Sequence, residues 1–172
     1  GVSVAPAVRA LSELKGVQGR MELAAKHPNG ASIYVDYAHT PAALGSVLAA
    51  LRPHVTGMLH LVFGCGGNRD PGKRVEMGRV AEAAADYIIV TDDNPRNEDP
   101  GRIRRSILTG CPSAREIGDR SEAIAAAISV LKPNDILVIA GKGHESVQIL
   151  GDRIVPFDDV QITQQVAGGL TG

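Results

Sequence analysis

Residues 59–71 read LHLVFGCGGNRDP, so a largely apolar run is followed by a glycine-rich loop and then by Asp70 and Pro71. A short apolar run that ends at glycine predicts a buried strand. Asp followed by Pro is typical of the start of a helix, because Asp caps the first turn and Pro fits its geometry. The stretch therefore predicts a strand joined directly to a helix, which is the repeating unit of α/β folds.

The same unit recurs on both sides of this stretch. Further strands are predicted over residues 33–37, 87–91 and 136–140, and helices over 41–51, 71–85, 100–108 and 121–131. Thr40 and Asp99, each followed by Pro, mark two of the helix starts, and Asp119 or Ser121 marks the last. The alternation predicts a Rossmann-like, three-layer α/β domain with a mainly parallel sheet and helices on both faces.

Other elements are predicted at the two ends of the chain. A short helix is predicted over residues 6–14. Asn29-Gly30 is a strong hairpin signal between apolar stretches at 20–26 and 32–36. Gly151-Asp152 predicts a terminal β-hairpin over 147–157, which a weaker helix follows.

Composition excludes several classes of function. The 172 residues carry 18 Lys+Arg and 19 Asp+Glu, so the net charge of −1 gives no sign of nucleic-acid or membrane binding. Cys65 and Cys111 fit no metal-ligand spacing, and no long apolar run or secretory leader is visible. We therefore expect a cytoplasmic protein with reduced thiols. The first residue, Gly1, suggests an excerpt from a longer protein.

Chemically versatile side chains gather in four loops, each at the end of a predicted strand. Ligands of open parallel sheets bind outside the carboxyl ends of the strands, so we expect one site there. The loops are 36–40 (DYAHT), 64–70 (GCGGNRD), 92–96 (DDNPR) and 141–145 (GKGHE).

Charges of both signs in these loops suit a zwitterionic ligand. The guanidinium forks of Arg69 and Arg96 can each take a carboxylate with two hydrogen bonds, while Asp93 and Glu145 can face an ammonium group. Two plainer interpretations stay open. Loop 64–70 can be a tight turn whose glycines need positive φ, and loop 92–96 can be an Asx-type turn with a surface arginine.

Other readings of the loops are weaker. Asp36 and His39 can pair as a base or contact a ribose, although such a pair is more often structural. His144 has no second histidine at helical spacing, so a metal site is not expected. Nothing near Cys65 marks an activated thiolate. The glycine loop lacks the third glycine of a dinucleotide fingerprint, which disfavours a dinucleotide-binding oxidoreductase. It also lacks the Lys-Ser/Thr ending of a phosphate loop.

Five motifs, in this order, resemble the C-terminal domain of the Mur ligase family, and within it the members that add diaminopimelate. They are GRME at 19–22, DYAHTP at 36–41, the loop at 64–74, DNPR at 93–96 and GKGHE at 141–145. The resemblance spans residues 19–157. It departs at Val75, where the family commonly has proline, and at Val147, where an aromatic residue is common.

The resemblance implies a domain division and a set of ligand contacts. Residues 1–18 are implied to be a linker or helix from the end of a preceding central domain, and residues 19–172 to be the C-terminal domain. The residues implied for meso-diaminopimelate are Arg69, Asp93, Asn94, Pro95, Arg96, Gly141 and Glu145, and those for ATP are Arg20, Asp36 and His39. Arg96 is implied to select diaminopimelate over lysine, because the additional distal carboxylate needs an arginine.

The implied reaction is ATP-dependent amide formation in peptidoglycan synthesis. ATP activates the D-glutamate γ-carboxylate of UDP-MurNAc-L-Ala-D-Glu, and the diaminopimelate amine attacks it. ATP and Mg²⁺ are implied to bind mainly through a central domain, so no catalytic or metal-binding residue is expected in this chain, which should be inactive alone. The alternatives are a domain of a lysine-adding or other Mur ligase, of a folylpolyglutamate synthetase, or a non-catalytic amino-acid-binding module.

Overall fold

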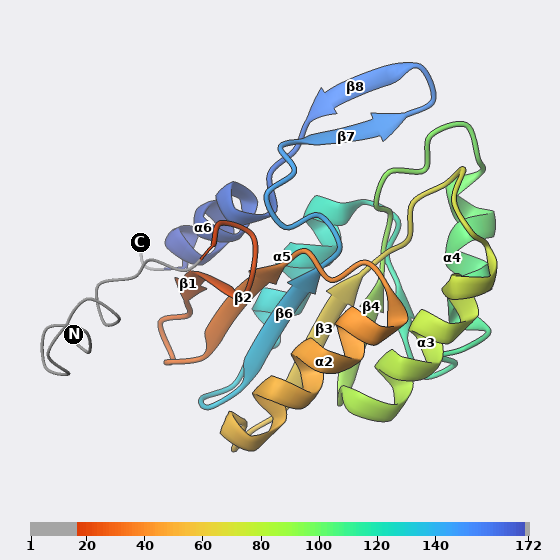
Figure 1. Ribbon diagram of the computed structural model, residues 1–172. Coiled ribbons are helices and arrows are strands. Elements are labelled where there is room, and N and C mark those ends of the chain that lie inside the picture. Colours follow the sequence, from red (N-terminus) through yellow and green to blue (C-terminus); the bar gives the residue numbers. More distant parts are fainter. Residues whose placement is uncertain (1–16, 171–172) are drawn as a thin grey trace, which may run out of the picture.

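A computed structural model of the chain describes residues 17–170 (Figure 1). The helix predicted over 6–14, and all but the last two residues of the segment 1–18, lie outside the described residues. The fold is a sheet between two layers of helices, with a separate hairpin near the carboxyl end. The predicted α/β class and terminal hairpin are therefore confirmed.

The central sheet has six strands in the order β1-β2-β6-β3-β4-β5. The strands are β1 (Glu22–Lys26), β2 (Ser32–Asp36), β3 (Leu59–Phe63), β4 (Tyr87–Val90), β5 (Arg115–Glu116) and β6 (Ile136–Ala140). Only β1 runs antiparallel to its neighbour, as the hairpin signal at Asn29-Gly30 predicts. Every residue of β3 and β6 is buried, because helices cover both faces of these strands.

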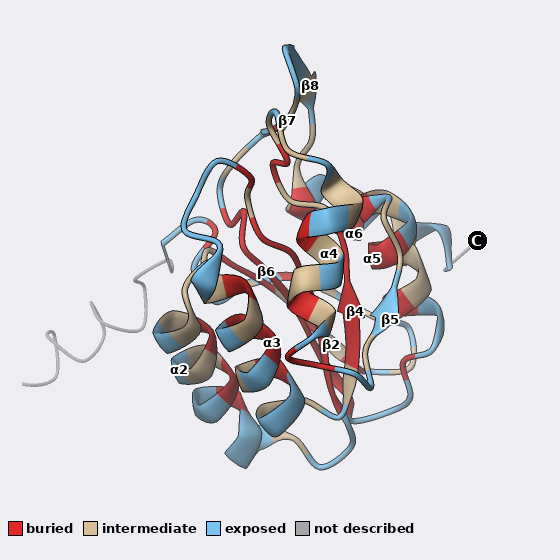
Figure 2. Ribbon diagram, turned by 90° about the vertical axis from the view of Figure 1, so that its right-hand side faces the viewer, coloured by how far each residue is buried: buried red, intermediate tan, exposed pale blue. Residues whose placement is uncertain are grey.

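The helices divide between the two faces of the sheet. Helices α2 (Pro41–Leu51), α3 (Gly72–Ala84) and α4 (Pro100–Leu108) pack on one face, and α5 (Arg120–Ser129) and α6 (Asp159–Gly169) pack on the other. Leu44, Met77 and Ile107 contribute to the first core, and Ile124 and Ala167 to the second. Buried residues follow the strands and the inner helix faces, whereas the outer faces are exposed (Figure 2).

Several boundaries differ from the prediction. Helix α3 begins at Gly72 with Pro71 as its cap residue, and the Asp70 carboxylate accepts a 2.9 Å bond from the Gly72 N–H. Asp119, rather than Ser121, caps α5. The two-residue β5 and the 3₁₀ turn Arg52–His54 were not predicted, because elements this short carry no periodic pattern.

The terminal hairpin forms a sheet of its own. Strands β7 (Val147–Leu150) and β8 (Arg153–Pro156) pair with each other in an antiparallel hairpin, as the sequence predicts, and a single bridge joins Leu150 to Arg96. No helix in the described part of the chain is long and apolar enough to cross a membrane.

Strand register sets the position of the site. Asp36 lies opposite Ala140, Ala140 opposite Phe63, and Phe63 opposite Val90. The loops that leave β2, β6, β3 and β4 therefore all begin at one level of the sheet.

Candidate functional site

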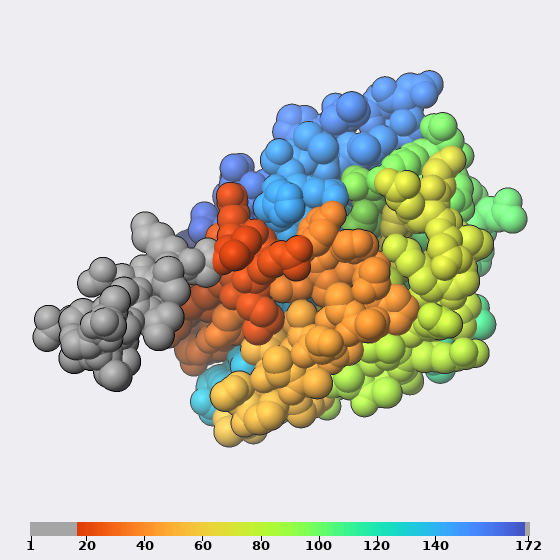
Figure 3. Space-filling view, in the orientation of Figure 1, coloured from red at the N-terminus to blue at the C-terminus, as the bar shows by residue number. Residues whose placement is uncertain are grey.

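The four loops surround one cavity of about 130 Å³ at the carboxyl edge of the sheet. Its lining residues are Tyr37, His39, Gly64, Cys65, Gly66, Arg69, Lys73, Asp93, Asn94, Arg96, Gly141 and Glu145. In Figure 3 the orange, yellow and green segments that carry three of the loops adjoin on one face below the blue hairpin. The convergence of these loops, expected because each follows a predicted parallel strand, is confirmed.

Two guanidinium groups line the cavity. Arg96 is half-buried, and its Nη1 donates a 2.9 Å bond to the carbonyl of Gly67. Its Nε and Nη2 make no hydrogen bond within residues 17–170. Arg69 is exposed and has no hydrogen-bond or ion-pair partner among the described residues. Both arginines thus keep donors for an anionic group in the cavity.

Two carboxylates face the same space. Asp93 Oδ1 accepts a 2.7 Å bond from the backbone N–H of Asn94. Glu145 Oε2 accepts a 2.9 Å bond from the side-chain amide of Asn94. Because the lining holds both cations and carboxylates, it can take a ligand that carries both charges.

The glycine-rich loop is shaped by close approach rather than by positive φ. Gly64, Gly66 and Gly67 have ordinary φ values, and Asn68 is the residue of that loop with positive φ, at 52°. A Cβ on Gly67 would lie 1.9 Å from the carbonyl oxygen of Pro95, and one on Gly66 would lie 2.8 Å from Arg96 Nη1. The positive-φ interpretation of these glycines is wrong. They allow loop 64–70 to pack against the loop that carries Arg96.

Gly141 meets both requirements for glycine. Its φ is 119°, and a Cβ there would lie 2.9 Å from Asp93 Oδ2. The side chain of Asp93 therefore occupies space that any other residue at position 141 would contest.

Loop 92–96 is more than a surface turn. Arg96 has φ 52°, and its backbone is held by the hairpin, since its N–H donates to Ile149 O (3.0 Å) and its carbonyl accepts from Gly151 N–H (2.7 Å). Asp92 points elsewhere and pairs with Arg104; its burial raises its pKa despite that ion pair.

The residues implied for ATP do not all lie together. His39 lines the cavity. Asp36 does not line it; its Oδ2 accepts from Met21 N–H and its Oδ1 from Ala38 N–H, each at 2.7 Å. Asp36 is thus held by backbone N–H groups and not by His39. The suggested pairing of Asp36 with His39 as a general base is therefore wrong. The Arg20 guanidinium lies 5.5 Å from the centre of the Tyr37 ring, beside the cavity.

Sequence reasoning missed a fully buried cation at the site. The side chain of Lys142 has no exposed surface, and its Nζ donates to Asn94 Oδ1 (3.0 Å) and Glu145 Oε2 (3.4 Å). The position of Lys142, between two glycines after a buried strand, is the only sequence signal for it.

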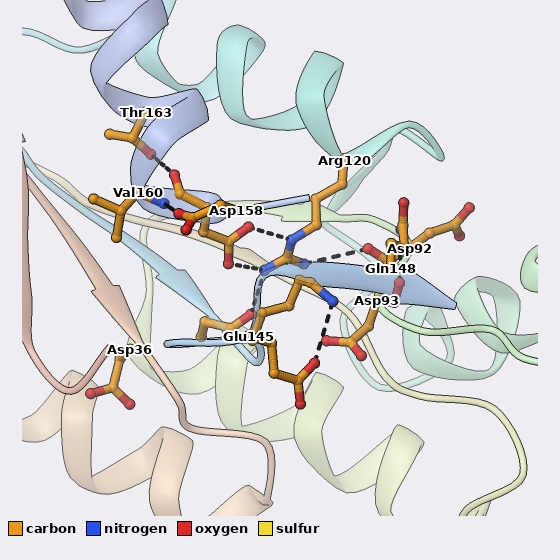
Figure 4. A network of polar contacts seen from close by, with 12 residues as sticks. Asp36, Asp92, Asp93, Arg120, Glu145, Gln148, Asp158, Val160 and Thr163 are labelled. Carbon is orange, nitrogen blue, oxygen red and sulfur yellow. Dashed lines mark hydrogen bonds and ion pairs between the residues drawn. The ribbon is translucent and has the colours of Figure 1, made fainter. Parts of the chain in front are cut away.

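A second missed feature is the ion pair beneath the site. Arg120 donates from Nε and Nη2 to the two carboxylate oxygens of Asp159, both at 2.8 Å, and neither side chain is exposed. Arg120 Nη2 also donates to the carbonyl of Ala140, the last residue of β6. Figure 4 shows Arg120 near Asp93 and Glu145, and Asp36 apart from the network.

The chemistry of Cys65 is settled by burial. Desolvation raises the pKa of its thiol to about 12, against the opposing charge of Lys73. A thiol with this pKa is protonated at neutral pH, which agrees with the expectation that Cys65 is not a nucleophile.

Comparisons with known proteins identify the relatives of this chain. Residues 19–143 match the family model described as Mur ligase, glutamate ligase domain. The chain is 52% identical over 169 residues to the UDP-N-acetylmuramoyl-L-alanyl-D-glutamate--2,6-diaminopimelate ligase of Zymomonas mobilis, covering 96% of this chain and 35% of that protein. It is 55% identical over 159 residues to the ligase of the same name from Chelativorans sp., covering 92% of this chain and 33% of that protein.

A solved structure agrees with these relatives. A UDP-N-acetylmuramoyl-L-alanyl-D-glutamate--2,6-diaminopimelate ligase superposes with a TM-score of 0.85 at 39% identity, covering all of this chain and 36% of that one. The chain thus spans about a third of the length of the relatives it matches.

Proposed function

Because the chain belongs to the Mur ligase family, through its glutamate ligase domain, we propose that it is the C-terminal, amino-acid-binding domain of a ligase that adds meso-diaminopimelate to UDP-MurNAc-L-Ala-D-Glu. Residues 19–172 form this domain in the proposal, and residues 1–18 lead into it from a central domain. The longer protein makes an amide at the expense of ATP, in the cytoplasm, for peptidoglycan synthesis.

The observation that carries the proposal is that Arg96, whose Nε and Nη2 have no hydrogen-bond partner within residues 17–170, lines a cavity. Arg69, Asp93 and Glu145 line the same cavity. Diaminopimelate has an ammonium and a carboxylate at each end, whereas lysine lacks the distal carboxylate. With diaminopimelate, each of the two arginines has a carboxylate to bind, whereas with lysine the second arginine has none. This supports diaminopimelate over lysine as the substrate.

The role of these residues in the reaction is to position the amine. In this proposal Arg69 and Arg96 bind the carboxylates of diaminopimelate, and Asp93 and Glu145 lie against its ammonium side. The bound amino acid then presents its attacking amine to the activated γ-carboxylate in one orientation. Asn94, Pro95 and Gly141 shape the loops that carry these groups. The residues proposed for the ATP side are His39, which lines the cavity, and Arg20, which lies beside it. Asp36 is proposed to support loop 36–40.

Mg²⁺ is expected in the longer enzyme, where it would neutralise the phosphate charges of ATP. Within residues 17–170, no group of three or more His, Cys, Asp and Glu side chains is placed to hold a metal ion. The described residues therefore do not fit this ion.

Amide-resolved NMR of the 172-residue chain tests the site. We expect millimolar meso-diaminopimelate to shift the backbone amides of Gly66, Arg96 and Gly141, because these residues line the cavity. L-lysine at the same concentration should shift them much less. Shifts confined to residues outside the four loops would contradict the proposal, and so would equal shifts with the two amino acids.

A further inference from the structure

Lys142 contacts both Asn94 and Glu145 from beneath the cavity, without lining the cavity itself. A buried ammonium group is costly unless its donors are satisfied and a carboxylate lies near. A carboxylate lies near here, since Nζ is 3.4 Å from Glu145 Oε2, and Nζ also donates to Asn94 Oδ1 at 3.0 Å, so two acceptors within residues 17–170 serve its three N–H groups. The arrangement needs an explanation beyond packing, because a buried apolar side chain would avoid the cost.

The contacts of Asn94 fix the orientation of its side-chain amide. Oδ1 faces two donors, Lys142 Nζ and the backbone N–H of Ile149, each at 3.0 Å. An ammonium and an N–H can only donate, so the amide cannot turn over without placing its own NH₂ group against them. Nδ2 is therefore directed at Glu145, to which it donates at 2.9 Å.

The side chain of Glu145 is in turn held through only one of its two carboxylate oxygens, Oε2, within residues 17–170. Its Oε2 takes both bonds, from Asn94 Nδ2 and Lys142 Nζ, while Oε1 has no partner within residues 17–170. About a third of the Glu145 side chain is exposed, and it lines the cavity. One oxygen is thus fixed from below, and the other is left for a ligand.

We propose that Lys142 is a positioning residue that sets the amide of Asn94 in one orientation and, through it, presents Glu145 Oε1 to the ammonium group of the bound amino acid. This inference rests on the proposed function for the identity of the ligand. The orientation of Asn94 is a property of the free chain and is measurable without a ligand. Lys142 does not touch the amino acid in this account.

The test compares three variants of the 172-residue chain. Lys142→Met removes the ammonium but keeps an unbranched stem, and Lys132→Met is the matched control at an exposed lysine elsewhere. Asn94→Asp keeps an acceptor for Lys142 and Ile149 but has no N–H for Glu145. It serves as the second variant in case Lys142→Met does not fold.

The first readout is the pair of side-chain NH₂ signals of Asn94 in ligand-free chain, with thermal unfolding as the check on the fold. We expect Lys142→Met to shift these signals and speed their exchange with water, whereas Lys132→Met leaves them unchanged. Unchanged Asn94 signals in folded Lys142→Met would overturn the proposal, whichever ligand the chain binds.

The second readout is affinity for meso-diaminopimelate. We expect Lys142→Met and Asn94→Asp each to weaken it at least tenfold, and adding Glu145→Gln to Lys142→Met to cost little more. Wild-type affinity in either variant would overturn the inference. If wild-type chain itself does not bind meso-diaminopimelate, the proposed function fails, and the Asn94 signals alone then decide whether Lys142 positions this amide.

Discussion

The guanidinium of Arg96 donates a 2.9 Å hydrogen bond to the carbonyl of Gly67, and this bond joins the loops that carry the two arginines of the cavity. Gly66 makes the approach possible, because a Cβ there would lie 2.8 Å from Arg96 Nη1. Nη1 thereby holds the position of the guanidinium, with a second, 3.4 Å bond to the carbonyl of Asn94, while Nε and Nη2 remain for a ligand. The glycine-rich loop acts as a support for Arg96.

Arg69 should contribute to ligand binding through charge. It lies exposed at the cavity and has no internal partner among the described residues, so Arg69→Ala leaves no buried group unpaired. We expect meso-diaminopimelate to bind roughly tenfold more weakly, which is about 1.4 kcal/mol, and the loss to shrink as salt is raised. Calorimetric titration at two salt concentrations measures this. Arg153→Ala, at an exposed arginine on β8, is the control and should bind as wild type.

Gly141 should be less replaceable than Gly151. Both have positive φ, 119° and 60°, but only at Gly141 would a Cβ collide with another residue, Asp93. We expect Gly151→Ala to lower the free energy of unfolding by about 1 kcal/mol through backbone strain alone. Gly141→Ala should cost more and also weaken ligand binding, because Asp93 must move. Urea unfolding compares the two, and equal losses of stability would show that the contact with Asp93 does not matter.

The Arg120–Asp159 pair should be needed for stability but replaceable as a unit. Both side chains are fully buried, so Arg120→Met leaves the carboxylate of Asp159 without its partner. We expect a loss of about 3–5 kcal/mol. The double variant Arg120→Met with Asp159→Met should recover at least half of this, since neither charge remains. Urea unfolding tests both variants, and two additive losses would contradict the account.

Much of the fold could be predicted from the sequence, because the buried strand 136–140 is wholly apolar, strand 59–63 is apolar except for His60, and capping residues precede the helices. The strand order could not, since it depends on which strands pair in space. The same reason hid the contacts of single side chains. Arg120 meets Asp159 39 residues away, and Lys142 meets Asn94 48 residues away.

The candidate site divides in the same way. Loops at strand ends could be located from the motifs, and Arg69, Asp93, Arg96 and Glu145, which the motifs single out, line the cavity. Which donor each carboxylate oxygen accepts from could not be predicted. Asp36 ends its strand, one residue before the predicted end, and backbone N–H groups of Met21 and Ala38 occupy both of its oxygens.

The two buried thiols should make the chain less stable in alkali. Burial raises the pKa of Cys65 to about 12 and that of Cys111 to about 11, from 9.0. The thiols therefore stabilise the fold fully below pH 9, and this contribution is lost as pH rises, because the unfolded chain releases protons that the native chain keeps. The loss should approach about 1 kcal/mol per thiol near pH 10. Urea unfolding at pH 8 and pH 10 should show a smaller drop in Cys65→Ala/Cys111→Ala than in wild type. An equal drop would assign the pH dependence to other groups.

Arg96 carries the central claim, and its test is the ratio of two affinities. Calorimetric titration of wild-type chain should give tighter binding of meso-diaminopimelate than of L-lysine, and weak binding of both is expected because the chain spans about a third of the length of its relatives. In Arg96→Ala the affinity for meso-diaminopimelate should fall to that for L-lysine, while the affinity for L-lysine changes little. Equal affinity of wild-type chain for the two amino acids, or a ratio that survives Arg96→Ala, would contradict the assignment.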